Sequence, residues 1–106
     1  MNINTYQQQA SETAIYQDKV IYPTLGLVGE AGEIANKVKK ILRDNSGELQ
    51  EEVRQNLIAE LGDVLWYIAA LATDLNIELS EVANKNIEKL NSRKNRGTIG
   101  GSGDNR

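Results

Sequence analysis

The sequence predicts an all-α fold, a four-helix-bundle-like domain completed by homo-oligomerisation. Residues that favour helices, chiefly Ala, Leu, Ile, Glu and Lys, fill most positions, whereas aromatic residues are few. Apolar residues recur with a 3.6-residue period in four segments separated by short connectors, as in helix bundles. The third segment is apolar on nearly every side, and three neighbours in a chain of 106 residues are too few to cover it. We therefore expect a homodimer or homotetramer.

The first helix is predicted over residues 4–18, with Asn4 or Thr5 as its N-cap. Residues 19–23 follow as a connector that ends at Pro23, because proline is tolerated in the first turn of the next helix.

The second helix is predicted over residues 24–43, where apolar residues form one continuous arc. The sequence Asp44-Asn45-Ser46-Gly47 is a turn signal. A third helix is predicted to follow over residues 51–74.

Ser80 is the expected N-cap of a fourth helix, which ends near Arg96. The last ten residues include four glycines and predict a loop or tail. The chain thus divides into one helical domain, residues 1–96, and a glycine-rich tail, residues 97–106.

The composition excludes several kinds of site. The chain has no Cys and no His, so it lacks thiolate ligands, disulfides and the commonest catalytic base. A net charge of −3 argues against nucleic acid as a partner. No apolar run reaches the roughly 18 residues that span a bilayer, and no signal-peptide pattern precedes the first helix. We therefore expect a cytoplasmic protein with no membrane partner.

Two acidic pairs at helical spacing, Glu30-x-x-Glu33 and Glu60-x-x-Asp63, are the most informative feature of the sequence. Residues three apart share a helix face, and the second pair interrupts an otherwise apolar segment. Removing ionised carboxylates from water costs several kcal/mol each unless they are paired or bind a metal. The sequence therefore predicts a positive partner at Glu60 and Asp63.

Antiparallel packing of the second and third helices would bring the four carboxylates together. Oxygen ligands without His or Cys match hard cations, so we expect Mg²⁺, with Mn²⁺ as its replacement. Mg²⁺ in proteins commonly takes substrate phosphates as further ligands. Gly26 and Gly29, one turn before Glu30, would let a ligand or another helix approach the backbone closely.

Cationic residues are placed to neutralise such phosphates. Lys37 and Lys40 continue the acidic face of the second helix toward its C-terminal end. On the fourth helix, Asn86, Lys89 and Arg93 share one face, for which a simple solvated surface is the alternative explanation.

These residues resemble the MazG-like nucleoside triphosphate pyrophosphohydrolases of the all-α NTP pyrophosphatase superfamily. The matching motifs are Gly29-Glu-Ala-Gly-Glu-Ile34 and Ala59-Glu-Leu-Gly-Asp-Val-Leu-Trp-Tyr-Ile68. The resemblance extends through Asn86-Ile-Glu-Lys-Leu-Asn-Ser-Arg93 to the tail, and so covers about residues 24–106.

The resemblance implies Mg²⁺-dependent hydrolysis of a nucleoside or deoxynucleoside triphosphate to the monophosphate and pyrophosphate. It implies that the four carboxylates are the metal ligands and catalytic residues, namely Glu30, Glu33, Glu60 and Asp63. It also implies that Tyr67 contacts the nucleoside. The residues implied to contact phosphates are Lys37, Lys40, Asn86, Lys89 and Arg93.

Two other readings of the sequence stand beside this one. A ferritin-like di-iron protein would need Glu-x-x-His motifs, which a chain without His lacks. A non-catalytic helical dimerisation or regulatory module would explain the apolar third helix. It would not explain two carboxylates inside that apolar surface.

Overall fold

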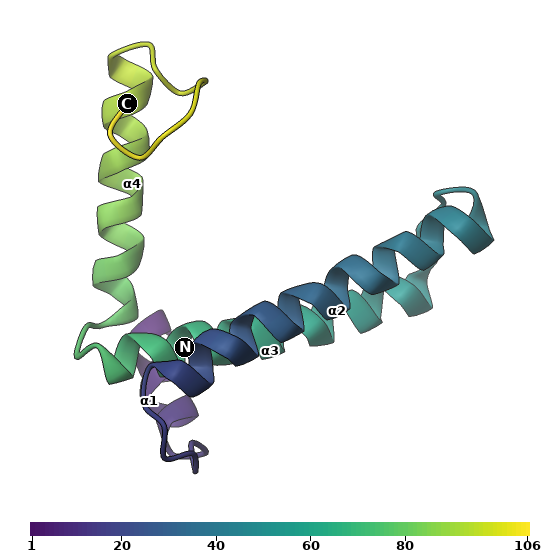
Figure 1. Cartoon of the computed structure of the whole chain (residues 1–106), viewed down its shortest axis with the longest axis horizontal. Helices are drawn as coiled ribbons and strands as arrows, with labels where there is room; N and C mark the ends of the chain where they lie inside the picture. The colour runs from purple at the N-terminus through teal and green to yellow at the C-terminus, as the bar shows by residue number, and fades with distance from the viewer.

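The computed structural model describes all 106 residues. It contains four α-helices and no strand, which confirms the all-α prediction (Figure 1). The four helices are α1 (Ile3–Ser11), α2 (Ile21–Asn45), α3 (Glu51–Asp74) and α4 (Leu79–Asn95).

The long helices α2 and α3 lie side by side as an antiparallel hairpin (Figure 1). Ser46 and Gly47 end α2 in the left-handed region, with φ of 54° and 83°, and the Gly47 N–H donates to the carbonyl of Ile41. The predicted bounds of α3 agree with the structure. Helix α2 ends at Asn45, two residues later than predicted, so only Ser46 and Gly47 of the predicted turn lie outside it. The antiparallel arrangement sets the acidic pairs opposite each other.

Helix α1 is shorter than predicted, since it ends at Ser11 rather than Asp18. The hydroxyl of Ser11 donates to the carbonyl of Gln8, and that of Thr13 to the carbonyl of Ala10. Such local bonds compete with continuation of the helix. Residues 12–20 therefore form the connector to α2, which begins three residues earlier than expected, at Ile21.

The N-terminus of α4 is capped by side chains of α1. The N–H of Leu79 donates to Oε1 of Gln7 at 2.8 Å, and that of Ser80 donates to Oδ1 of Asn4 at 3.0 Å. The prediction of Ser80 as the N-cap was wrong, because α4 begins at Leu79 and α1 satisfies these orphan donors. The remainder of α4 stands away from the hairpin (Figure 1).

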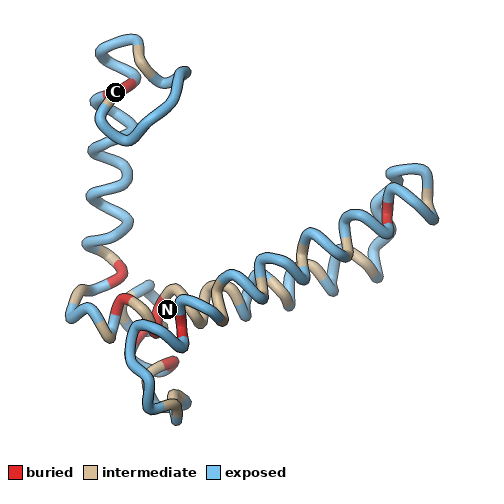
Figure 2. The backbone as a smooth tube through the Cα atoms, in the orientation of Figure 1, coloured by how far each residue is buried: buried red, intermediate tan, exposed pale blue.

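One chain does not close into a bundle. Its radius of gyration is 16.7 Å, against about 13 Å for a compact domain of this length. The hydrophobic core is small and consists of Ala10, Ala69, Ala72 and Leu79. Figure 2 shows buried residues mainly near the junction of α1, α3 and α4.

Helix α3 is not covered by its neighbours within one chain, as expected for a chain of this length. Ile58 is 46% exposed and Leu61 is 58% exposed, because only α2 runs along this half of α3. By length and composition alone, α3 is apolar enough to cross a membrane, although Glu60 and Asp63 interrupt its apolar stretch. It nevertheless contacts all three other helices, as the central helix of a small domain does.

Candidate active site

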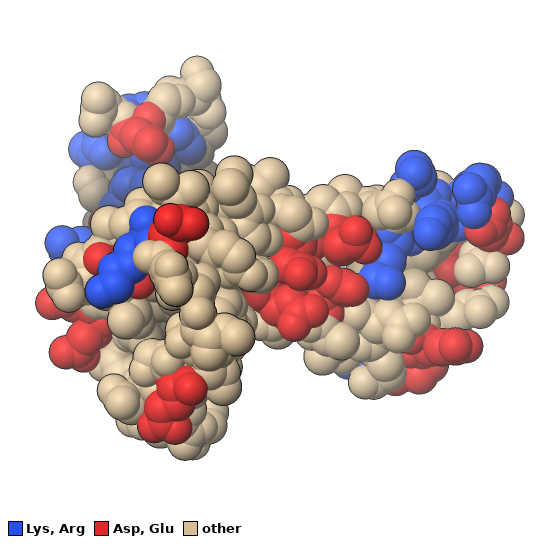
Figure 3. All heavy atoms as spheres, turned by 60° about the horizontal axis from the view of Figure 1, so that its bottom comes forward, with Lys and Arg blue, Asp and Glu red and all other residues tan.

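Three of the four predicted carboxylates meet between α2 and α3. Glu30 of α2 and Glu60 and Asp63 of α3 each offer an oxygen, and the three oxygens lie within 4.8 Å of one another. We call these residues the carboxylate cluster. Figure 3 shows the acidic surface on the middle of the hairpin, with Lys and Arg side chains toward the α2–α3 turn. Packing of two amphipathic helices has thus brought like charges together.

Glu60 is the most constrained member of the cluster. Its side chain is only 18% exposed, and Oε1 lies 3.7 Å from Nζ of Lys37. Its other oxygen, Oε2, is buried without a hydrogen-bond partner. A buried carboxylate oxygen without a partner carries a desolvation penalty, so the cluster is electrostatically incomplete on this side.

The pKa of Glu30 reflects the closeness of the other carboxylates. Burial raises the pKa of this carboxyl above its ordinary value, and the neighbouring carboxylates of Glu60, Asp63 and Glu33 raise it further. A divalent cation bound between these carboxylates would instead lower the pKa of Glu30. The cluster therefore has the donor type and the charge to hold a hard cation.

Glu33 lies one turn farther along α2, exposed to solvent and outside the carboxylate cluster. Its negative charge still contributes to the raised pKa of Glu30. The structure therefore brings the two acidic pairs together but leaves one of the four carboxylates at the margin.

An aromatic pocket adjoins the cluster on the side of α1. Glu30 and Asp63 line a cavity of about 390 Å³ together with Thr13, Trp66 and Tyr67. The latter three residues also line a second cavity, of about 410 Å³, which we call the aromatic pocket. Its other lining residues are Ile15, Tyr16 and Tyr22.

Tyr67 is held close to α2 by the absence of a side chain at Gly26. The Tyr67 ring occupies the space that a Cβ at position 26 would take. Gly29, by contrast, has open space around it within the chain, so only Gly26 shows the close approach expected of both. Burial is the main cause of the raised pKa of Tyr67, and the hydroxyl of Tyr22 and the charges of Glu30 and Asp63 add to it.

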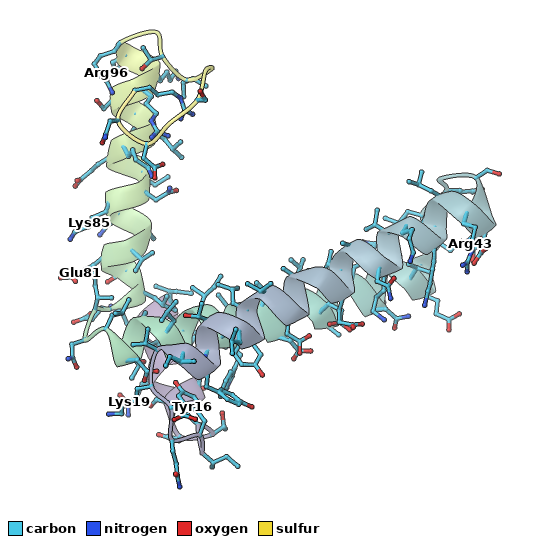
Figure 4. All side chains as sticks on the ribbon, viewed as in Figure 1. Tyr16, Lys19, Arg43, Glu81, Lys85 and Arg96 are labelled. Carbon is cyan, nitrogen blue, oxygen red and sulfur yellow. The ribbon has the colours of Figure 1, made fainter.

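A cavity lined by lysines adjoins the cluster on the opposite side. Lys37 and Lys40 of α2 and Asn56 of α3 contribute to a space of about 250 Å³ near the α2–α3 turn. Along the hairpin, the order is therefore aromatic pocket, carboxylate cluster and lysines. Figure 4 marks the two ends of this row, with Tyr16 at the α1 end and Arg43 near the turn.

The polar residues predicted on α4 do not reach this row within one chain, because α4 does not contact α2. Asn86 and Lys89 line a separate cavity of about 370 Å³. Arg93 is 5% exposed and donates to the backbone carbonyl of Asp104 at 2.8 Å. The Asp104 carboxylate lies 3.9 Å from Lys89 and 3.8 Å from Arg93. The tail thus folds back onto α4.

Sequence reasoning missed four residues beside the cluster: Thr13, Tyr16, Tyr22 and Trp66. The chain has only five aromatic residues, four Tyr and one Trp, and four of the five surround this pocket. The small number of aromatic residues was visible in the sequence, but their convergence depends on contacts among α3, the connector and the start of α2.

Comparison with known proteins agrees with the acidic motifs. The family described as the MazG nucleotide pyrophosphohydrolase domain matches residues 23–98. The chain is 56% identical to the Gene 37 protein of Mycobacterium phage L5 over 114 aligned positions, which cover all of both chains. It is 40% identical over 72 residues to the uncharacterised protein YvdC of Bacillus subtilis (strain 168), covering 63% of this chain and 68% of that protein. No solved structure matches. With its acidic pairs facing each other across α2 and α3, the chain belongs to the MazG nucleotide pyrophosphohydrolase family.

Proposed function

We propose that this protein hydrolyses a nucleoside or deoxynucleoside triphosphate to the monophosphate and pyrophosphate. The observation that carries the proposal is the carboxylate cluster, with the unpartnered Oε2 of Glu60 inside it. Aromatic rings on one side and lysines on the other provide two chemically different ends for a nucleotide.

The donor set fits Mg²⁺ or Mn²⁺, since it offers only carboxylate oxygens. Glu30, Glu60 and Asp63 would hold the ion, and we propose Glu33 as a fourth ligand after rotation of its exposed side chain. When bound, such an ion lowers the pKa of water and polarises phosphoryl oxygens.

The chain's own residues supply the remaining chemistry. Because no His is present, we assign proton acceptance from the attacking water to one of the four carboxylates. Lys37 and Lys40 lie on the turn side of the cluster, where they would neutralise the charge on the departing pyrophosphate. Tyr67 lies on the opposite side, toward the nucleoside.

We propose further that the working form is a homodimer or homotetramer. Eighteen large hydrophobic residues are exposed in the single chain, among them Leu25 and Val28 of α2 and Leu61 of α3. Burying such surface is the usual driving force of oligomerisation. In such an oligomer, Asn86 and Lys89 of one copy would lie near the phosphates bound by another copy. Within its own chain, α4 does not contact α2.

The proposal places the enzyme in the cytoplasm, where its substrate is free nucleotide rather than nucleic acid. The net charge of −3 argues against nucleic acid as the substrate, because proteins that bind nucleic acid are normally basic overall.

A non-catalytic dimerisation or regulatory module is the second candidate, favoured by the exposed apolar surface of α2 and α3. A pyrophosphate-release assay across a panel of ribo- and deoxyribonucleoside triphosphates, with Mg²⁺ or with EDTA, separates the two. Release that depends on Mg²⁺ and disappears in Glu60→Gln supports the hydrolase. If the folded wild-type protein releases no pyrophosphate from any nucleotide, the hydrolase proposal is wrong and the non-catalytic module is supported.

A further inference from the structure

The glycine-rich tail after α4 is held in a defined shape by its own arginine. The guanidinium of Arg106 donates to the backbone carbonyls of four tail residues, namely Thr98, Ile99, Gly100 and Gly103. These bonds close residues 98–106 into a ring, which lies beside the end of α4 and is yellow in Figure 1. The tail therefore moves as one body, unlike a flexible linker of the same composition.

The ring is joined to α4 at two places. At the helix end, Gly97 turns the chain with φ of 73°, and the N–H of Thr98 donates to the carbonyl of Arg93 at 2.7 Å. Farther along, a single hydrogen bond joins residues 99–106 to α4, from the guanidinium of Arg93 to the carbonyl of Asp104 at 2.8 Å. Loss of this second attachment would free the ring to turn about Gly97 while α4 stays intact.

Two cations of α4 lie where the ring touches the helix. Lys89 and Arg93 are four residues apart and so share one face of α4. The side chain of Arg93 is only 6% exposed, yet it donates one hydrogen bond, whereas a guanidinium carries five N–H donors. A buried cation with unused donors beside a second cation is a favourable position for an anion.

The carboxylate of Asp104 fills that position weakly. Its Oδ1 lies 3.9 Å from Nζ of Lys89 and 3.8 Å from a guanidinium nitrogen of Arg93. Both distances exceed the roughly 2.7–2.9 Å of a charge-assisted hydrogen bond, and the Asp104 side chain is 91% exposed. Exposed ion pairs of this kind contribute little to stability. Asp104 therefore faces both cations without binding either tightly.

A phosphate group is a better anion for the same two cations. It carries more negative charge than one carboxylate and presents several oxygens to the unused donors of Arg93. Asp104 and a phosphate cannot occupy one position together, so the two compete.

We propose that Asp104 is a latch, which faces Lys89 and Arg93 in the absence of nucleotide and is displaced by a polyphosphate, so that the tail is released from α4. The inference rests on the proposed function and adds a form of regulation to it. The tail lowers the affinity of the protein for phosphates and opens when they bind.

The competition is measured by titrating pyrophosphate into the full-length protein in EDTA and recording the heat. Asp104→Asn should bind pyrophosphate more tightly than wild type by up to roughly fivefold, which is equivalent to about 1 kcal/mol, the upper value for an exposed ion pair. Glu88→Gln is the matched control, because it removes an exposed carboxylate from α4 and changes the net charge equally. Equal tightening in Glu88→Gln would show that net charge is the cause and would overturn the latch.

A double substitution tests whether Asp104 acts through the proposed cations. In a Lys89→Ala background, Asp104→Asn should tighten pyrophosphate binding less than it does alone, because one of the two cations that Asp104 faces is gone. The same tightening in both backgrounds would contradict the assignment.

Release of the tail is measured with a nitroxide label. The chain has no Cys, so Ser102→Cys at an exposed position of the tail takes a single label. Pyrophosphate should narrow the electron paramagnetic resonance lines, because the released tail moves more freely. Unchanged lines, or broader lines that show the tail closing over the anion, would overturn the latch.

The two proposals fail separately, because the titration needs neither metal nor turnover. If Mg²⁺-dependent hydrolysis proceeds while Asp104→Asn binds pyrophosphate no more tightly than wild type, the latch is wrong and the hydrolase stands. If Asp104→Asn tightens binding but no triphosphate is hydrolysed, the hydrolase is wrong and the latch stands. Pyrophosphate that binds neither wild type nor Asp104→Asn would also overturn the latch.

Discussion

The ring of Tyr67 on α3 lies against the backbone of Gly26 on α2, in the space that any side chain at position 26 would fill. This contact lets the two helices approach closely at the point where the aromatic pocket meets the carboxylate cluster. One missing side chain thus positions an aromatic ring beside three carboxylates.

Gly26→Ala should reduce the free energy of unfolding by about 1 kcal/mol, although alanine is the better helix former. The new methyl group would collide with the Tyr67 ring, and this overpacking outweighs the gain in helix propensity. Urea denaturation measures the change. The same substitution in a Tyr67→Ala background should be neutral or stabilising, because the ring is gone. Equal destabilisation in both backgrounds would place the conflict elsewhere.

Glu60→Gln should abolish Mg²⁺-dependent pyrophosphate release, with a loss of at least roughly a hundredfold. Mg²⁺ should also stabilise the wild-type protein, by about 2.7 kcal/mol at a concentration one hundred times its Kd, and should not stabilise the variant. Thermal melts with and without the ion provide this second readout. Glu52→Gln, which removes an exposed carboxylate from the same helix, serves as the control. Retained Mg²⁺ stabilisation in Glu60→Gln would contradict the assigned ligand.

Without metal, Glu30→Gln should make the protein more stable at neutral pH. The folded pKa of Glu30 lies above the ordinary 4.5 because of burial and neighbouring carboxylates. The protonated form is therefore favoured by folding, and its contribution is lost as the pH rises through the folded pKa. Melting temperatures in EDTA should differ between wild type and variant at neutral pH and converge below pH 4.5. An equal difference at every pH would show that charge is not the cause.

Arg93→Ala should cost about 1.5–3 kcal/mol, since it removes a buried guanidinium bonded to the carbonyl of Asp104. Asp104→Asn should cost less than about 1 kcal/mol, because the Asp104 side chain is 91% exposed and the carbonyl bond remains. Urea denaturation compares the two variants. A loss in Asp104→Asn as large as in Arg93→Ala would mean that the carboxylate, rather than the backbone, anchors the tail.

Light scattering should report a dimer or tetramer for the wild-type protein. Val28 on α2 is 66% exposed in the single chain, so Val28→Glu would place a charge in the expected interface. We expect this variant to dissociate at concentrations at least roughly tenfold higher than wild type. Val28→Leu, which keeps the surface apolar, should retain the assembly. A monomeric wild-type protein would contradict the expected oligomer.

Much of the fold follows from local sequence patterns. The apolar period predicted the bounds of α3, and the Asp44–Gly47 turn signal predicted the hairpin. Helical spacing predicted that each acidic pair shares a face, and the structure brings Glu30, Glu60 and Asp63 together. These features were predictable because they depend on residues close together in the chain, or on two regular helices packing through their apolar faces.

Tertiary contacts decided the rest. The start of α4 depends on Gln7, which lies 72 residues before Leu79, and the connector depends on Asp74, which lies 54 residues after Val20. The helical period of a sequence contains no information about such long-range hydrogen bonds. The predictions for the end of the first helix and for the N-cap of the fourth helix were therefore wrong. The helical period also did not predict that α4 leaves the hairpin and carries Lys89 away from the carboxylates. Local residue spacing determines which side chains share a helix face, whereas contacts between distant segments determine which residues pack against that face.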